Sequence, residues 1–235
     1  KVFAHGWLLV GGEKMSKSKL TGIAPSDITD HFGVDAFRYY FLRAIPFGSD
    51  GSFSWEDMSA RYTSELANDF GNLASRAIAM IEKYCDGKIP AVAQEPELAN
   101  AAAAAVAAAD EKIAALDFQG GILAILELCK NVNGYVTEKA PWVLAKDPAN
   151  KSELDRVLYA TCESLRILAV LFHPVMPETS QKLWRALGAT ALGELSAQRI
   201  DDVARWGQLP MGAQTSRGEV LFPRLPETAS EEQRG

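Results

Sequence analysis

Apolar side chains recur every three or four residues over most of the chain from about residue 55 to residue 187. This spacing places them on one face of an α-helix, so the pattern predicts long amphipathic helices whose apolar faces pack together. Prolines and glycines divide the pattern into five stretches joined by short connections, and such connections favour antiparallel neighbours. The pattern therefore predicts a mostly α fold built around an antiparallel helical bundle.

The five predicted helices differ in length and composition. The first runs for about 30 residues from Trp55 to the Asp86-Gly87 pair. The second is the alanine-rich segment 99–109, extended to Leu116, whose high helix propensity favours a helix over a linker. The others are 118–136, closed by Pro141; 154–172, closed by Pro174; and about 177–187, which begins with a proline and ends before a glycine.

The residues before Trp55 follow another pattern. Residues 2–10 are rich in β-prone side chains and end at Gly11-Gly12, which predicts a short strand followed by a loop. Helix signals follow at Pro25 and over 34–45. We therefore expect a strand, a loop and short helices in 1–53, the bundle in 54–190, and an irregular tail in 191–235 that packs back on the bundle, in which 220–222 could form a strand.

Charge and cysteine content limit the classes of function. The formal net charge of −6 argues against binding nucleic acid by bulk charge, so a nucleic-acid site would have to be local. The three cysteines are far apart and have apolar neighbours, which predicts buried thiols and no metal site. No apolar run is long enough to span a bilayer and no targeting segment is visible, which predicts a cytoplasmic protein.

The loop after the predicted strand carries the most informative residues. Two lysines and two serines follow the Gly-Gly pair, in the order Lys14-Met15-Ser16-Lys17-Ser18. Two ammonium groups on a flexible loop suit the distributed negative charge of a polyphosphate. On charge alone, a solvated basic surface loop explains the same residues.

The five residues are identical to the KMSKS signature of class I aminoacyl-tRNA synthetases, and the resemblance chooses between these readings. It implies that this is the C-terminal end of a Rossmann-type catalytic domain, and that the loop closes over ATP with Mg²⁺ as the metal. Lys17 would stabilise the departing pyrophosphate electrostatically, and Lys14 would steady the loop or the phosphates. The further ATP contacts would be Met15, Ser16, Ser18 and His5, and the hinge Gly11 and Gly12. A lone histidine in a strand is otherwise a packed structural residue.

A second signal lies in the first predicted helix. Asn72 and Arg76 are four residues apart, so they share a helix face with Asn68 one turn earlier. An amide and a guanidinium side by side can read the edges of unstacked bases in an RNA loop, although a polar stripe beside the core would show the same spacing. The segment from Asn72 to Arg76, Asn-Leu-Ala-Ser-Arg, resembles the start of the anticodon-binding bundle of methionyl-tRNA synthetases.

A third signal is Ala140-Pro141-Trp142, after the third predicted helix. A tryptophan after a proline can simply cover the core. The turn resembles the anticodon site of the methionine family, which implies that Trp142, preceded by Pro141, stacks on a base of the CAU anticodon. Asn133, two turns earlier, is a weaker candidate for the same surface.

Together the motifs resemble the C-terminal part of a methionyl-tRNA synthetase. The resemblance implies ATP-dependent formation of methionyl-adenylate and transfer to tRNA(Met) by a protein expected to be monomeric. The HIGH motif, the amino-acid pocket and any zinc site would lie upstream of Lys1, so the chain is expected to be part of a longer protein. Another class I synthetase and a module that only binds tRNA remain alternatives. Candidates for phosphate contacts are Arg61, Lys83, Lys130 and Lys139.

Overall fold

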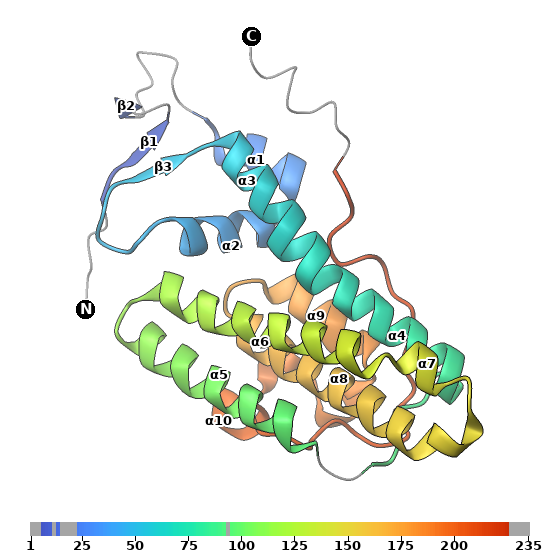
Figure 1. Ribbon diagram of the computed structural model, residues 1–235. Coiled ribbons are helices and arrows are strands. Elements are labelled where there is room, and N and C mark those ends of the chain that lie inside the picture. The colour runs from blue at the N-terminus through green and yellow to red at the C-terminus, as the bar shows by residue number, and fades with distance from the viewer. Residues whose placement is uncertain (1–5, 11–12, 15–22, 93–94, 226–235) are drawn as a thin grey trace.

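The computed structural model describes residues 6–10, 13–14, 23–92 and 95–225. A small sheet and two short helices occupy one end of a long helix, and the helical bundle packs along the rest of it (Figure 1). The predicted fold class, mostly α with a strand and short helices ahead of an antiparallel bundle, is confirmed. Within the described residues, no helix has both the length and the apolar character needed to cross a bilayer.

The sheet contains β1 (Leu8–Val10), β2 (Glu13–Lys14) and β3 (Gly51–Phe53) in the order β2-β1-β3. β1 pairs antiparallel with β2 and parallel with β3. The predicted first strand is confirmed over 8–10, whereas residues 1–5 lie outside the described part. β3 was not predicted, because three residues are too few to show an alternating pattern. A Cβ at Gly51 would lie only 2.4 Å from the Ile45 side chain, so the close packing of this strand requires glycine.

Two short helices link the sheet to the bundle: α1 (Pro25–Phe32) and α2 (Val34–Ala44), both where the sequence predicts them. α2 is tied to the far end of the chain. The Asp35 carboxylate accepts a hydrogen bond from the Thr179 amide at 2.6 Å. Arg38 donates to the carbonyls of Val175 and Pro174, both at 2.8 Å. These contacts fix the N-terminal elements on the bundle, and the proposed division at residue 53 stays a prediction.

The long first helix is continuous but not uniform. It comprises α3 (Trp55–Arg61), a π-helical segment (Tyr62–Gly71) and α4 (Asn72–Cys85). The predicted extent is correct, but the expectation of regular α-helical spacing throughout was wrong. π-Helical turns are rare and are frequently found at functional sites, and side chains of α2 and α6 hold this one, as described below. Asp86 and Gly87, both with positive φ, end the helix.

The remaining helices are α5 (Pro96–Ala114), α6 (Phe118–Lys139), α7 (Pro141–Leu144), α8 (Lys151–Phe172), α9 (Pro177–Ala186) and α10 (Ile200–Val203). The four longer predicted helices are confirmed, while the short α7 and α10 were not predicted. α8 is the central helix, because every side chain from 157 to 172 is buried. The alanine-rich α5 packs closely on α6, as its small side chains allow.

The segment after α9 contains two short 3₁₀ turns, Ala189–Leu192 and Leu195–Ala197, followed by α10 and an extended stretch along the long helix (Figure 1). The suggested strand at 220–222 is wrong, because these residues have no strand partner. Phe222 is nevertheless buried, with its ring 5.8 Å from that of Tyr62 and 6.4 Å from that of Phe70. Its apolar character therefore serves packing against the long helix.

Candidate nucleic-acid interface

Arg76 and Trp142 meet at the surface where α4 lies beside α7. The Arg76 guanidinium carbon lies 5.9 Å from the centre of the Trp142 ring. Trp142 is 40% exposed, so it does not cover the core. Ala140 adopts a positive φ of 45°, and the buried Pro141 then begins α7, which turns the chain sharply before Trp142. The result is an exposed aromatic surface beside a cation.

Two asparagines lie along the same helix as Arg76. The Asn72 amide nitrogen donates to the Asn68 side-chain oxygen at 3.4 Å, and both residues are exposed. This bond orders the two amides while leaving the Asn72 oxygen and the Asn68 nitrogen outside it. The surface therefore presents a planar aromatic ring, a guanidinium and two amides, the groups that recognise splayed bases in single-stranded RNA.

Asn133 takes a different orientation from the one suggested by its sequence position. Its amide nitrogen donates to the backbone carbonyl of Asp69 at 2.9 Å and to that of Cys129 at 3.1 Å. The side chain thus joins α6 to the π-helical segment. It contacts Asp69, which directly follows Asn68 in the sequence, but its donor nitrogen bonds to backbone carbonyls.

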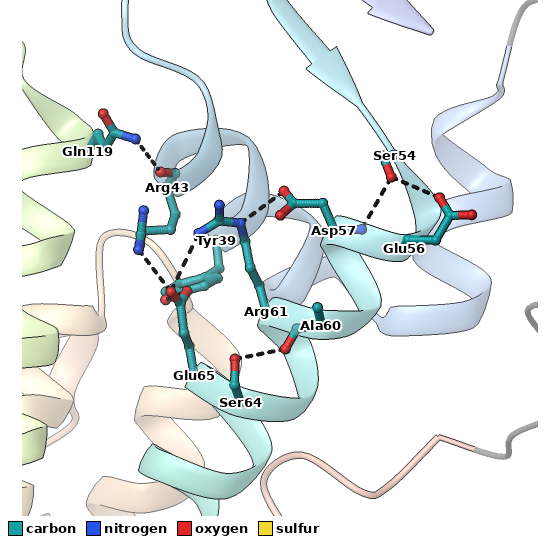
Figure 2. Close-up of polar contacts among 10 residues, drawn as sticks. All are labelled: Tyr39, Arg43, Ser54, Glu56, Asp57, Ala60, Arg61, Ser64, Glu65 and Gln119. Atoms are coloured by element: carbon teal, nitrogen blue, oxygen red, sulfur yellow. Dashed lines mark hydrogen bonds and ion pairs between the residues drawn. The ribbon is translucent and has the colours of Figure 1, made fainter. Parts of the chain in front are cut away.

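A network of polar and charged side chains joins the first half of the π-helical segment to α2 (Figure 2). The Glu65 carboxylate accepts hydrogen bonds from the Tyr39 hydroxyl at 2.6 Å and from Arg43 at 2.8 Å. Arg61 lies 3.5 Å from the same carboxylate and 2.9 Å from that of Asp57. Burial, with the nearby Glu65 charge, raises the pKa of Tyr39 well above its usual range, so this hydroxyl stays a donor. No sequence signal identified the link from Tyr39 and Arg43 to Glu65, because these residues come from separate helices.

Of the predicted ATP-loop residues, only the Lys14 backbone belongs to the described part. Leu9 of β1 pairs with Lys14 of β2, so the chain reverses direction between these strands. The other predicted ATP-site and hinge residues lie outside the described residues: His5, Gly11, Gly12, Met15, Ser16, Lys17 and Ser18.

The four proposed phosphate contacts have varied surroundings. Arg61 belongs to the network of Figure 2. The Lys83 ammonium lies 5.1 Å from the Tyr84 ring centre, and that of Lys139 lies 5.5 Å from the Tyr135 ring centre. The charge of Lys130 acts to lower the pKa of Asp69, but burial of this carboxyl raises its pKa by more.

The described residues contain no group of three or more His, Cys, Asp or Glu side chains arranged to hold a metal ion. Cys129 and Cys162 are buried free thiols, as predicted, whereas Cys85 is only half-buried. Burial raises the pKa of each thiol, and that of Cys85 reaches about 11. These cysteines are therefore poor metal ligands and poor nucleophiles at neutral pH.

Two family models match the chain in succession. Residues 1–78 match the model of class I tRNA synthetases (M), and residues 87–234 match the anticodon binding domain of methionyl tRNA ligase. The chain belongs to the methionyl-tRNA ligase family. The second family match contains Trp142, and the first contains Asn68, Asn72 and Arg76.

Relatives in the methionyl-tRNA ligase family match nearly the whole chain. The methionine–tRNA ligase of Streptomyces coelicolor is 60% identical over 97% of this chain and 44% of the relative. That of Enterococcus faecalis is 44% identical over 96% of this chain and 34% of the relative. The chain therefore spans less than half the length of these relatives.

Solved structures of the same family share the fold. The apo Mycobacterium tuberculosis methionyl-tRNA synthetase superposes with a TM-score of 0.77 at 33% identity, over 96% of this chain and 44% of that one. The same enzyme bound to methionyl-adenylate gives a TM-score of 0.79 at 35% identity, over 94% and 43% of the two chains. The relation thus extends to the sheet-bearing end and the bundle alike.

Proposed function

We propose that this chain is the part of a methionine–tRNA ligase that reads the CAU anticodon of tRNA(Met) and carries the lysine loop used in methionine activation. The observation that carries the proposal is the exposed Trp142 ring beside Arg76, with the amides of Asn72 and Asn68 along the same helix. The ring supplies a platform for one unstacked base, and the guanidinium and amides supply hydrogen bonds to base edges. Pro141 fixes the turn that presents the ring.

The catalytic part of the proposal rests on the family and on the lysine loop. In it, ATP and methionine are substrates and Mg²⁺ accompanies the nucleotide. Lys17 acts as the electrostatic catalyst on the leaving pyrophosphate, and Lys14 steadies the loop. The other loop residues and His5 contact ATP, and Gly11 and Gly12 let the loop close. Parallel pairing with β3, in three residue pairs, holds β1, the strand that precedes this loop, in the sheet.

The decisive test compares binding of the chain to two anticodon stem-loops, one bearing CAU and one bearing another anticodon, at a fixed salt concentration. Stacking of one base on an aromatic ring contributes about 1–3 kcal/mol. Trp142→Ala should therefore weaken binding of the CAU stem-loop by roughly 5- to 150-fold. Val143→Ala changes the adjacent exposed apolar side chain and serves as the control. Equal binding of both stem-loops by the unmodified chain, or unchanged CAU binding by Trp142→Ala, would refute the proposal.

A further inference from the structure

The backbone carbonyl of Asp69 receives two side-chain donors from α6. The Asn133 amide nitrogen lies 2.9 Å from this oxygen, and the Cys129 thiol sulfur lies 3.4 Å from it. The same Asn133 nitrogen also donates to the Cys129 carbonyl at 3.1 Å. Both amide hydrogens of Asn133 are therefore directed at backbone acceptors, which leaves only its side-chain oxygen for any other partner.

The position of Asp69 makes these bonds consequential. Asp69 lies in the π-helical segment, directly after Asn68 and three residues before Asn72. At the end of this segment, the backbone N–H of Asn72 still donates to the Ala67 carbonyl five residues earlier. Each residue of an α-helix turns by about 100°. A change from π-helical to α-helical winding here would therefore alter the angle between the Asn68 and Asn72 side chains, which lie on one helix face in either winding, and would disturb their 3.4 Å contact.

The earlier part of the same segment is held by α2. Glu65 is bonded to Tyr39 and Arg43 of α2, with side-chain exposures of only 17% for Glu65 and 12% for Arg43 (Figure 2). The π-helical segment is thus restrained by α2 at Glu65 and by α6 at Asp69. Of these two restraints, the one from α6 adjoins the asparagine pair.

We propose that Asn133 is a positioning residue for anticodon reading: by holding the Asp69 carbonyl, it fixes the direction of Asn68 and Asn72 without contacting a base through its amide nitrogen. The inference rests on the proposed function. It differs from the simpler view that every polar side chain near Trp142 contacts RNA. Loss of the Asn133 donor leaves the Asp69 carbonyl with one fewer partner and weakens the restraint on the π-helical winding.

The test uses Asn133→Asp, which keeps the size and one side-chain oxygen but has no amide hydrogens. Asn133→Ala, which adds no charge, is measured beside it. The matched control is Val132→Ala, because Val132 is the fully buried neighbour on α6 and its truncation destabilises the helix without touching the Asp69 carbonyl. For each variant, the ratio of affinities for the CAU stem-loop and a stem-loop with another anticodon is measured, together with hydrogen exchange of residues 68–73 in the free chain.

Both Asn133 variants should lower the affinity ratio by about tenfold and speed exchange at 68–73 before RNA is added, whereas Val132→Ala should leave the ratio unchanged. Adding Asn72→Ala to Asn133→Asp should have little further effect, because Asn72 is already displaced. An unchanged ratio in Asn133→Asp would overturn the inference. Additive losses of affinity ratio in the double variant, with unchanged hydrogen exchange at 68–73, would also overturn it, since that result would assign Asn133 a direct base contact.

The outcome for the unmodified chain separates the two proposals. If it binds both stem-loops equally, the proposed function fails and the positioning role in reading fails with it. If it prefers CAU and Asn133→Asp keeps that preference, the positioning role alone is refuted.

Discussion

Replacing Glu163 with glutamine should destabilise the fold strongly, because this carboxylate joins α8 to the C-terminal segment. Glu163 and Arg166 are both 0% exposed and form a two-point ion pair with distances of 2.7 and 2.8 Å. The same carboxylate accepts the backbone amides of residues 207, 208 and 209 at 2.6, 3.0 and 2.9 Å. Arg166 in turn donates to the Arg205 carbonyl. Glu163→Gln therefore removes the negative charge that pairs with Arg166 and, in the same step, replaces one of the two oxygens that accept the backbone amides.

The magnitude follows from the burial. Removing one partner of a buried ion pair costs about 3–5 kcal/mol, because the remaining charge stays buried after losing its counter-charge. Natural domains have a total stability of about 5–15 kcal/mol, so Glu163→Gln should remove a large fraction of it. For a chain of this size, the thermal midpoint should fall by roughly 6–20 °C.

Chemical and thermal denaturation followed by circular dichroism would measure the loss, and trypsin cleavage at Arg205 would report release of the segment. Glu194→Gln is the control, because its pair with Arg185 is more than half exposed and its loss should leave the midpoint nearly unchanged. Adding Arg166→Met to Glu163→Gln should restore part of the stability, since neither charge of the pair then remains buried. A loss below about 1 kcal/mol for Glu163→Gln alone would refute the reasoning.

Three further predictions concern single residues. Gly134→Ala should stabilise the chain by about 0.5–1 kcal/mol in urea denaturation, because a Cβ there meets no atom within 4 Å and glycine is unfavourable inside a helix; a destabilised variant would contradict this. A thiol reagent should label Cys85 before Cys129 and Cys162 in mass spectrometry, because only Cys85 is partly accessible; simultaneous labelling would count against the packing. Burial raises the pKa of Asp69 in the folded chain, so ionisation of this carboxyl opposes folding. Asp69→Asn should therefore raise the denaturation midpoint at neutral pH, with the gain shrinking as the pH falls and Asp69 becomes protonated; a gain that is independent of pH would refute this.

Much of the interface was predictable because its residues are close in sequence. Asn68, Asn72 and Arg76 share one helix face by spacing alone, and Pro141 before Trp142 predicts a turn that can expose a ring. Arg76 and Trp142, by contrast, are 66 positions apart in the sequence, and no local pattern shows such a contact. The same applies to Asn133, whose donors were expected at the surface but bond to the Asp69 carbonyl.

The sequence by itself determined the approximate extent of the longer helices and the fold class, because apolar periodicity, prolines and glycines act within a few residues of where they stand. The prediction of the lysine loop likewise came from local sequence, because its five residues form an unbroken run. Only the tertiary structure decided the π-helical winding of 62–71, the parallel pairing of β1 with β3, and the buried Glu163–Arg166 pair. Each of these depends on backbone or charged groups brought together by chain segments that are distant in sequence, where the gain from pairing exceeds the local preference.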